Sequence, residues 1–176
     1  MRIDFKSKKQ IILIVFIALT LCFIFGQSVL PPDKSMETSD DVAEAVDGIF
    51  SAEESTEKDN PQRPFLTFVI EHIRKIAHFV EHGILGIEVF LLFFVLEKES
   101  GKERKIMPIG IKTLLFSLNI GLLVGFFDES IQILSGRNSS TLDVWLDFAG
   151  YITFTALITL GFILAKALKE RKKHRA

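Results

Sequence analysis

Four long apolar stretches alternate with polar segments along the chain. The first spans residues 11–30 and has no charged side chain, and the others follow at residues 76–96, 106–127 and 142–165. About twenty apolar residues are enough for a helix to cross a hydrocarbon core of about 30 Å. The pattern therefore predicts an all-α integral membrane protein, a helical bundle with four transmembrane helices.

The polar segments divide the chain into parts of different character. Residues 31–64 are rich in Ser, Glu, Asp, Thr and Pro, a composition that buries too little apolar surface to offset the entropy of ordering. We expect an N-terminal transmembrane anchor at 1–30, an acidic flexible extracytoplasmic loop at 31–64, a three-helix membrane domain at 65–165 and a basic cytoplasmic tail at 166–176. A cleaved signal peptide is the alternative for the first part, but no convincing cleavage site precedes Pro31.

Composition agrees with a membrane protein and adds one exclusion. Of the 176 residues, 48% are hydrophobic and 17 are Phe, while the formal net charge is -1. Cys22 is the single cysteine, so an intrachain disulfide is impossible and a cysteine-based metal site is implausible. The expected partner from composition alone is the lipid bilayer.

The distribution of basic residues predicts the orientation in the membrane. They crowd the amino tail before Ile11, the segment after Leu96 and the carboxyl tail after Ala165, and fewer lie at the opposite ends of the apolar stretches. By the positive-inside rule, both termini are expected in the cytoplasm. The carboxyl tail is then expected to set topology and to contact anionic lipids, not nucleic acid.

Polar residues gather at the ends of three stretches that this orientation places on the outer side. Helical spacing puts Arg74, His78 and Glu81 on one face of the second stretch. The third stretch ends in a polar segment, and the fourth begins with acids one turn apart. We expect one outer polar site with the ligand-binding candidates Arg74, Lys75, His78, Glu81, Asp128, Glu129, Gln132, Arg137, Asp143 and Asp147.

The charges of this predicted site do not balance. Its five acids outnumber its three Arg and Lys side chains. Protonation, a bound cation or a cationic part of a ligand would each compensate the excess of carboxylates. Gly150 shares a helix face with Asp143 and Asp147, and it is expected to let a neighbouring helix approach closely.

The same residues form motifs that resemble those of the VanZ-like family of bacterial membrane proteins. The motifs are Arg74-Lys75-Ile-Ala-His78-Phe-Val-Glu81, Asp128-Glu129-Ser-Ile-Gln132, Arg137 and Asp143-Val-Trp-Leu-Asp147-Phe-Ala-Gly150, within roughly residues 65–164. The resemblance implies a multi-pass protein of the bacterial cytoplasmic membrane. Because the founding member is associated with low-level teicoplanin resistance, it also implies a role in the cell envelope that lowers susceptibility to glycopeptides. A cell-wall precursor or a glycopeptide-related molecule is the expected ligand.

Two positions depart from the family pattern. Phe154 stands where a small residue often follows Gly150, which is expected to weaken a close helix crossing, and His82 stands where the family commonly has Tyr. With His82 the chain matches H-x-x-E-H, in which two histidines one turn apart bind zinc in inverted zinc peptidases. That fold is large and soluble, and so short a match arises by chance. We therefore expect no metal or cofactor, and His78, Glu81 and His82 are the less favoured metal set.

The sequence leaves open whether the site is catalytic. In an enzyme, His78, Glu81 and Asp128 are the candidate catalytic residues, and two arginines would hold a phosphate of a lipid-linked cell-wall intermediate. An obvious nucleophile motif or phosphatase signature is missing, so a non-enzymatic ligand site is favoured. The third interpretation is a structural or interaction protein in which the charges fix the packing of the helices.

Overall fold

The described part of the chain forms four long helices. The computed structural model describes residues 7–31, 41, 44–45, 72–101, 107–137 and 140–173, and within them there is no strand. The helices are α1 (Lys8–Val29), α4 (Ile73–Glu99), α5 (Ile111–Leu134) and α6 (Thr141–Lys173). Each is long and apolar enough to cross a membrane. The predicted all-α bundle with four transmembrane helices is confirmed.

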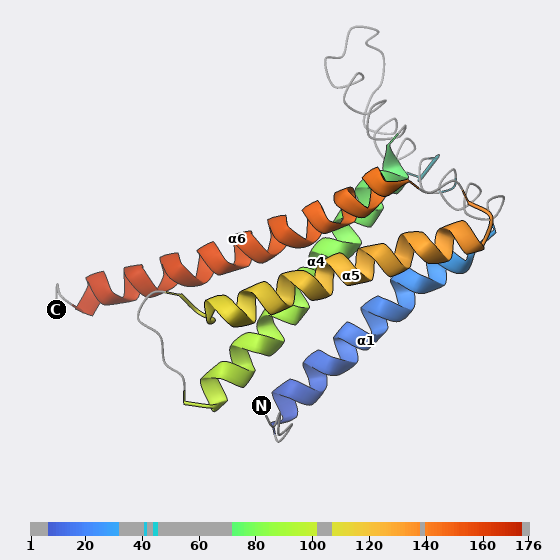
Figure 1. The fold of residues 1–176 in the computed structure, drawn as a ribbon. Helices are drawn as coiled ribbons and strands as arrows, with labels where there is room; N and C mark the ends of the chain where they lie inside the picture. Colours follow the sequence, from blue (N-terminus) through green and yellow to red (C-terminus); the bar gives the residue numbers. More distant parts are fainter. Residues whose placement is uncertain are drawn as a thin grey trace, which may run out of the picture.

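The four helices alternate in direction, so that the start of α1 and the end of α6 lie at one end of the bundle (Figure 1). Helix α4 contacts each of the other three and packs most extensively against α6, while α1 packs against α4 and α5. Figure 1 shows α1 and α6 on opposite sides of this arrangement. Nearly all of the expected acidic loop, residues 32–40, 42–43 and 46–64, lies outside the described residues, as do residues 65–71.

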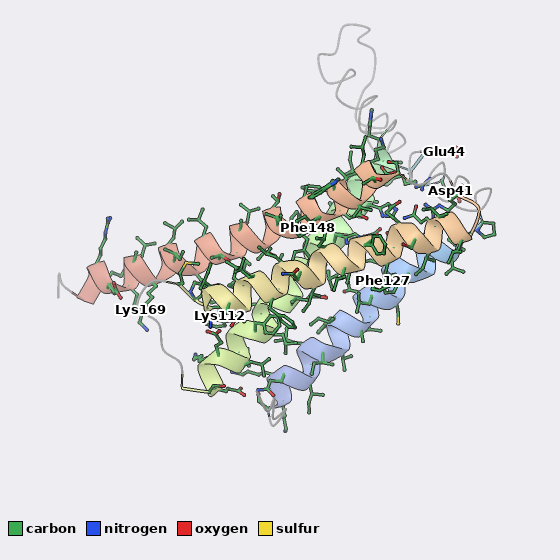
Figure 2. The ribbon with its side chains drawn as sticks, in the orientation of Figure 1. Asp41, Glu44, Lys112, Phe127, Phe148 and Lys169 are labelled. Atoms are coloured by element: carbon green, nitrogen blue, oxygen red, sulfur yellow. The ribbon has the colours of Figure 1, made fainter. Side chains whose placement is uncertain are left out.

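The exterior of the bundle is apolar along the helices. Phe127 is 55% exposed and Leu157 is 60% exposed, and Figure 2 shows Phe127 on α5 among such side chains. The inner contacts are made by a smaller set of buried residues, which includes Leu85 and Tyr151. Because the outer surface is apolar over the length of four spanning helices, the chain is a multi-pass membrane protein whose surroundings are a lipid bilayer.

Helix α5 begins and ends later than the apolar pattern predicts. It starts at Ile111, and the backbone N–H of Gly110, just before it, donates to both oxygens of the buried Glu97 carboxylate at 3.0 and 3.2 Å. It continues past Phe127 to Leu134, and Gly136 follows with a φ of 80°. The polar segment that follows the third apolar stretch is therefore helical as far as Leu134. Its side chains Asp128, Glu129 and Gln132 are buried inside the bundle.

Small residues bring α4 and α6 into close contact. A Cβ atom on Gly150 would overlap the carbonyl oxygen of Phe79, which confirms the expected close approach. The crossing is close despite Phe154, because a Cβ on Gly83 would lie 2.6 Å from the Phe154 ring. Glycine at position 83 thus provides the room that the bulky side chain at position 154 requires.

Candidate functional site

Two histidines of α4 meet one aspartate from each of α5 and α6 inside the bundle. One nitrogen or oxygen atom from each of His78, His82, Asp128 and Asp147 lies within 4.8 Å of all the others. We call these four residues the His–Asp cluster. The side chains of His82 and Asp128 are 0% exposed, and that of Asp147 is 1% exposed. Three helices therefore bury these three side chains, whereas that of His78 is 12% exposed.

The distances within the His–Asp cluster are longer than hydrogen bonds. His78 Nδ1 lies 3.4 Å from Asp128 Oδ2 and 3.7 Å from Asp147 Oδ1. His82 Nε2 lies 3.7 Å from Asp128 Oδ2 and 3.5 Å from Asp147 Oδ2. Good N–H···O hydrogen bonds measure about 2.7–3.2 Å. Within the described residues, His78 Nδ1, both ring nitrogens of His82 and both carboxylate oxygens of Asp147 have no hydrogen-bond partner.

The helix face that carries the cluster differs from the expected one. The prediction placed Glu81 on the same helix face as His78. In the structure it is His82 that joins His78 in the cluster. The two imidazole rings are stacked, and their centroids are 6.5 Å apart. Four residues along a helix return within about 40° of the same direction, whereas three residues leave a gap of about 60°. Glu81 lies outside the cluster. The H-x-x-E-H pattern is the sequence feature that places His82 one turn from His78.

Asp128 is fixed by neighbours on two helices. The hydroxyl of Ser28, on α1, donates to Asp128 Oδ1, and Gln132 Nε2 donates to Asp128 Oδ2 at 3.1 Å. Gln132 also donates to Glu129 Oε1 at 3.0 Å and accepts from Arg74 Nη2 at 3.0 Å. The structure thus joins four of the predicted residues in one network. It adds Ser28, for which the sequence held no signal.

A polar cavity adjoins the cluster at the end of the bundle where α4 and α6 begin and α5 ends. It has a volume of about 250 Å³ and is bordered by helices α4, α5 and α6. Basic and acidic side chains both face it. Its lining residues are His72, Arg74, Lys75, His78, Glu129, Gln132, Asp143, Leu146 and Asp147.

Two of the predicted site residues, Arg137 and Glu81, do not line the cavity, and a third, Asp143, lines it and also caps a helix. Arg137 is not among the cavity-lining residues. Its Nη1 donates to the Gln27 carbonyl of α1 at 2.8 Å, and burial lowers its pKa, as does the nearby Arg74. Asp143 lines the cavity and also caps α6, because its Oδ2 accepts from the backbone N–H and the hydroxyl of Ser140. Glu81 is not among the cavity-lining residues either.

A second, apolar cavity lies farther along α6. It has a volume of about 340 Å³, and α5 and α6 supply nearly all of its lining, including Leu114, Leu118, Ile152 and Leu160. Such a surface suits a hydrocarbon chain more than a polar ligand. The bundle therefore has a polar cavity bordered by α4, α5 and α6 and an apolar groove bordered by α5 and α6.

The His–Asp cluster has the donor types of a metal site. Two imidazole nitrogens and two carboxylate oxygens suit zinc and its neighbours among the transition metals. His78 beside a buried aspartate also has the arrangement of a general acid or base. Four helices long and apolar enough to span a membrane, three of which hold a buried polar cluster, define the chain as a small polytopic membrane protein.

Comparison with known proteins places this fold in a family. The family model described as VanZ/LLP1 matches residues 12–166. The chain belongs to this family, and the resemblance drawn from its motifs is confirmed. The match includes most of α1, which lay outside the resemblance at 65–164. No curated protein and no solved structure matches the chain.

Proposed function

We propose that the chain acts at the outer face of the bacterial cytoplasmic membrane, where its polar cavity binds a membrane-borne cell-wall precursor. Binding there would lower susceptibility to glycopeptide antibiotics such as teicoplanin. The observation that supports this proposal is the 250 Å³ cavity at the end of the bundle. With the termini in the cytoplasm, that end faces outward.

The charges of the cavity support a ligand that carries both signs. Arg74 and Lys75 approach it from α4, whereas Glu129, Asp143 and Asp147 approach from α5 and α6. Phosphate groups pair well with Arg and Lys, and amino groups pair with carboxylates. A lipid-linked precursor with a pyrophosphate and a peptide part has both kinds of group.

The apolar groove supports a ligand with a hydrocarbon tail. The groove is bordered by Ile152 and Leu160 of α6, and Asp147 of the same helix lines the polar cavity. Positions 147 and 152 are five residues apart, or about 7.5 Å along the helix axis. The two positions also lie about 140° apart around the helix axis, so the tail of a ligand whose headgroup is in the cavity would have to pass around α6 to reach the groove.

Binding of a purified precursor tests the proposal directly. We expect a lipid-linked cell-wall precursor to bind the protein in lipid nanodiscs. Lys75→Ala is expected to weaken binding about fivefold, roughly 1 kcal/mol for one exposed charge-assisted contact. Lys169→Ala, which removes an exposed lysine at the other end of α6 (Figure 2), is the matched control. Equal binding by the two variants would contradict a role of the cavity.

Antibiotic susceptibility tests the biological part of the proposal. A susceptible host that expresses the chain is expected to need more teicoplanin for inhibition than the same host with an empty vector. The Lys75→Ala variant, expressed at the same level, is expected to lose part of this difference, and Lys169→Ala is expected to keep it. No difference between the expressing host and the empty-vector host would remove the resistance claim.

The position of His78 supports a second candidate function, an enzyme that acts on a lipid-linked phosphate. His78 lines the cavity, and its Nδ1 lies 3.4 Å from the buried Asp128. This arrangement suits transfer of a proton to or from a bound phosphate ester. Release of phosphate from a lipid-linked pyrophosphate, lost in His78→Gln and kept in Lys169→Ala, would support it. Binding without turnover would leave the ligand site as the function.

A further inference from the structure

We propose that His78, His82, Asp128 and Asp147 bind one divalent transition-metal ion, with zinc as the expected metal. This inference reverses the sequence-based preference for no metal. The contributing atoms are His78 Nδ1, His82 Nε2, Asp128 Oδ2 and one oxygen of Asp147. All four residues come from helices, so the backbone holds the donors in place.

The distances between the donor atoms support a shared ion. Zinc binds histidine nitrogen and carboxylate oxygen at about 2.0–2.2 Å, so two ligands of a tetrahedral ion lie about 3.4 Å apart. With Asp147 Oδ2 as the fourth donor, the nitrogen–oxygen distances His78–Asp128, His82–Asp128 and His82–Asp147 are 3.4, 3.7 and 3.5 Å. One donor atom from each of the four residues lies within 4.8 Å of the others. Direct ion pairs between protonated histidines and aspartates would instead bring the atoms to about 2.7–2.9 Å. These three distances are too long for good hydrogen bonds and close to the separation of two ligands on a tetrahedral ion.

The unsatisfied atoms supply an independent reason for an ion. His82 and Asp147 are almost fully buried, and their nitrogens and oxygens have no hydrogen-bond partner among the described residues. A buried polar atom without a partner costs roughly 1–3 kcal/mol, and more when it is charged. Coordination of one ion would satisfy His82 Nε2 and one oxygen of Asp147 together.

The formal charges of the cluster also fit a divalent cation. Two neutral histidines and two aspartates carry a charge of minus two, which a divalent ion neutralises. Uncompensated carboxylates inside a membrane protein are costly. The ion would therefore remove the electrostatic penalty of these two buried carboxylates.

The surroundings hold the carboxylates in the required orientation. Ser28 donates to Asp128 Oδ1, so that Oδ2 faces the histidines. On α5, a Cβ atom at Gly125 would lie 3.3 Å from the Cβ of Asp147, so the glycine leaves space for that side chain. Metal sites commonly use such neighbours to orient their ligands.

The donor set favours zinc over the common alkaline-earth ions. Calcium and magnesium prefer six or more oxygen ligands, whereas two imidazoles are typical of zinc and related transition metals. His78 and Asp147 also line the polar cavity, so the site borders the space where a ligand is proposed to bind. The metal proposal does not rest on that ligand, and each is tested separately.

Metal content of the purified protein tests the proposal. The full chain, isolated with an affinity tag free of histidine, is loaded with zinc, dialysed against buffer without chelator and analysed by mass spectrometry of the elements. We expect about one zinc per chain. Asp147→Asn and His82→Gln preserve size and are expected to reduce zinc to below about a tenth of that value. Glu81→Gln, on the same turn of α4 but outside the cluster, is expected to keep it.

Cobalt gives a second readout that does not depend on tight retention of zinc. Substitution with Co²⁺ is expected to produce the strong visible absorption of a four-coordinate site, absent in Asp147→Asn. Circular dichroism and gel filtration check that each variant is folded. Wild-type protein with no retained zinc and no such spectrum would overturn the proposal. Equal zinc in folded wild-type and Asp147→Asn protein would overturn it as well.

Discussion

Gly150 of α6 lies against the backbone of Phe79 in α4, so close that a Cβ atom at position 150 would overlap the Phe79 carbonyl oxygen. This contact is close to the His–Asp cluster, because Phe79 directly follows His78 and Gly150 lies three residues after Asp147. The glycine therefore sets the separation of the two helices that supply three of the four cluster residues.

We expect Gly150→Ala to destabilise the bundle. The added methyl must push α6 away from α4, and overpacking of this kind costs about 1–3 kcal/mol. The midpoint of thermal unfolding in detergent, followed by circular dichroism, is the measurement. Gly161→Ala is the control on the same helix, because nothing lies within 4 Å of a Cβ atom there. A Gly150→Ala variant as stable as Gly161→Ala would contradict the packing described.

The four membrane-length helices of the described residues could be predicted from the sequence, because twenty apolar residues in a row have few alternatives to a spanning helix. The end of α5 could not be predicted from hydropathy, since Asp128 and Gln132 are polar but face the interior. The choice between Glu81 and His82 depends on where α6 packs, which the spacing within α4 does not reveal. The hydrogen bond from Ser28 to Asp128 could not be predicted either, because a single serine in an apolar stretch does not indicate what its hydroxyl contacts.

Tyr151 and Ser117 form a buried hydrogen bond between α6 and α5, with their oxygens 2.8 Å apart. We expect Tyr151→Phe and Ser117→Ala each to lower stability, because each leaves a buried partner unpaired. The double variant is expected to cost less than the two single changes added together, with a coupling of about 0.6 kcal/mol as in other membrane helices. Free energies of unfolding of the three variants and the wild type give the coupling. Strict additivity would show that the two hydroxyls do not interact.

We expect Ser28→Ala to weaken zinc binding without removing it. The hydroxyl orients Asp128 from α1, and loss of such a neighbour typically reduces metal affinity about 10–100-fold. Competition with a fluorescent chelator measures the affinity. Ser130→Ala is the control, because the Ser130 hydroxyl donates to the Phe126 carbonyl of its own helix. If both variants bound zinc as the wild type does, α1 would have no role in the metal site.

The proposed outward orientation of the site predicts which cysteines a membrane-impermeant reagent can reach. In a background with Cys22→Ala, a cysteine at Asn138, between α5 and α6, is expected to be labelled in intact cells. A cysteine at Lys169, near the opposite end of α6 (Figure 2), is expected to be labelled only after the membrane is opened. The physical reason is the excess of basic residues at the end that holds both termini, which the positive-inside rule assigns to the cytoplasm. The reverse labelling pattern would place the cavity on the cytoplasmic side, where a precursor exposed at the outer face cannot reach it.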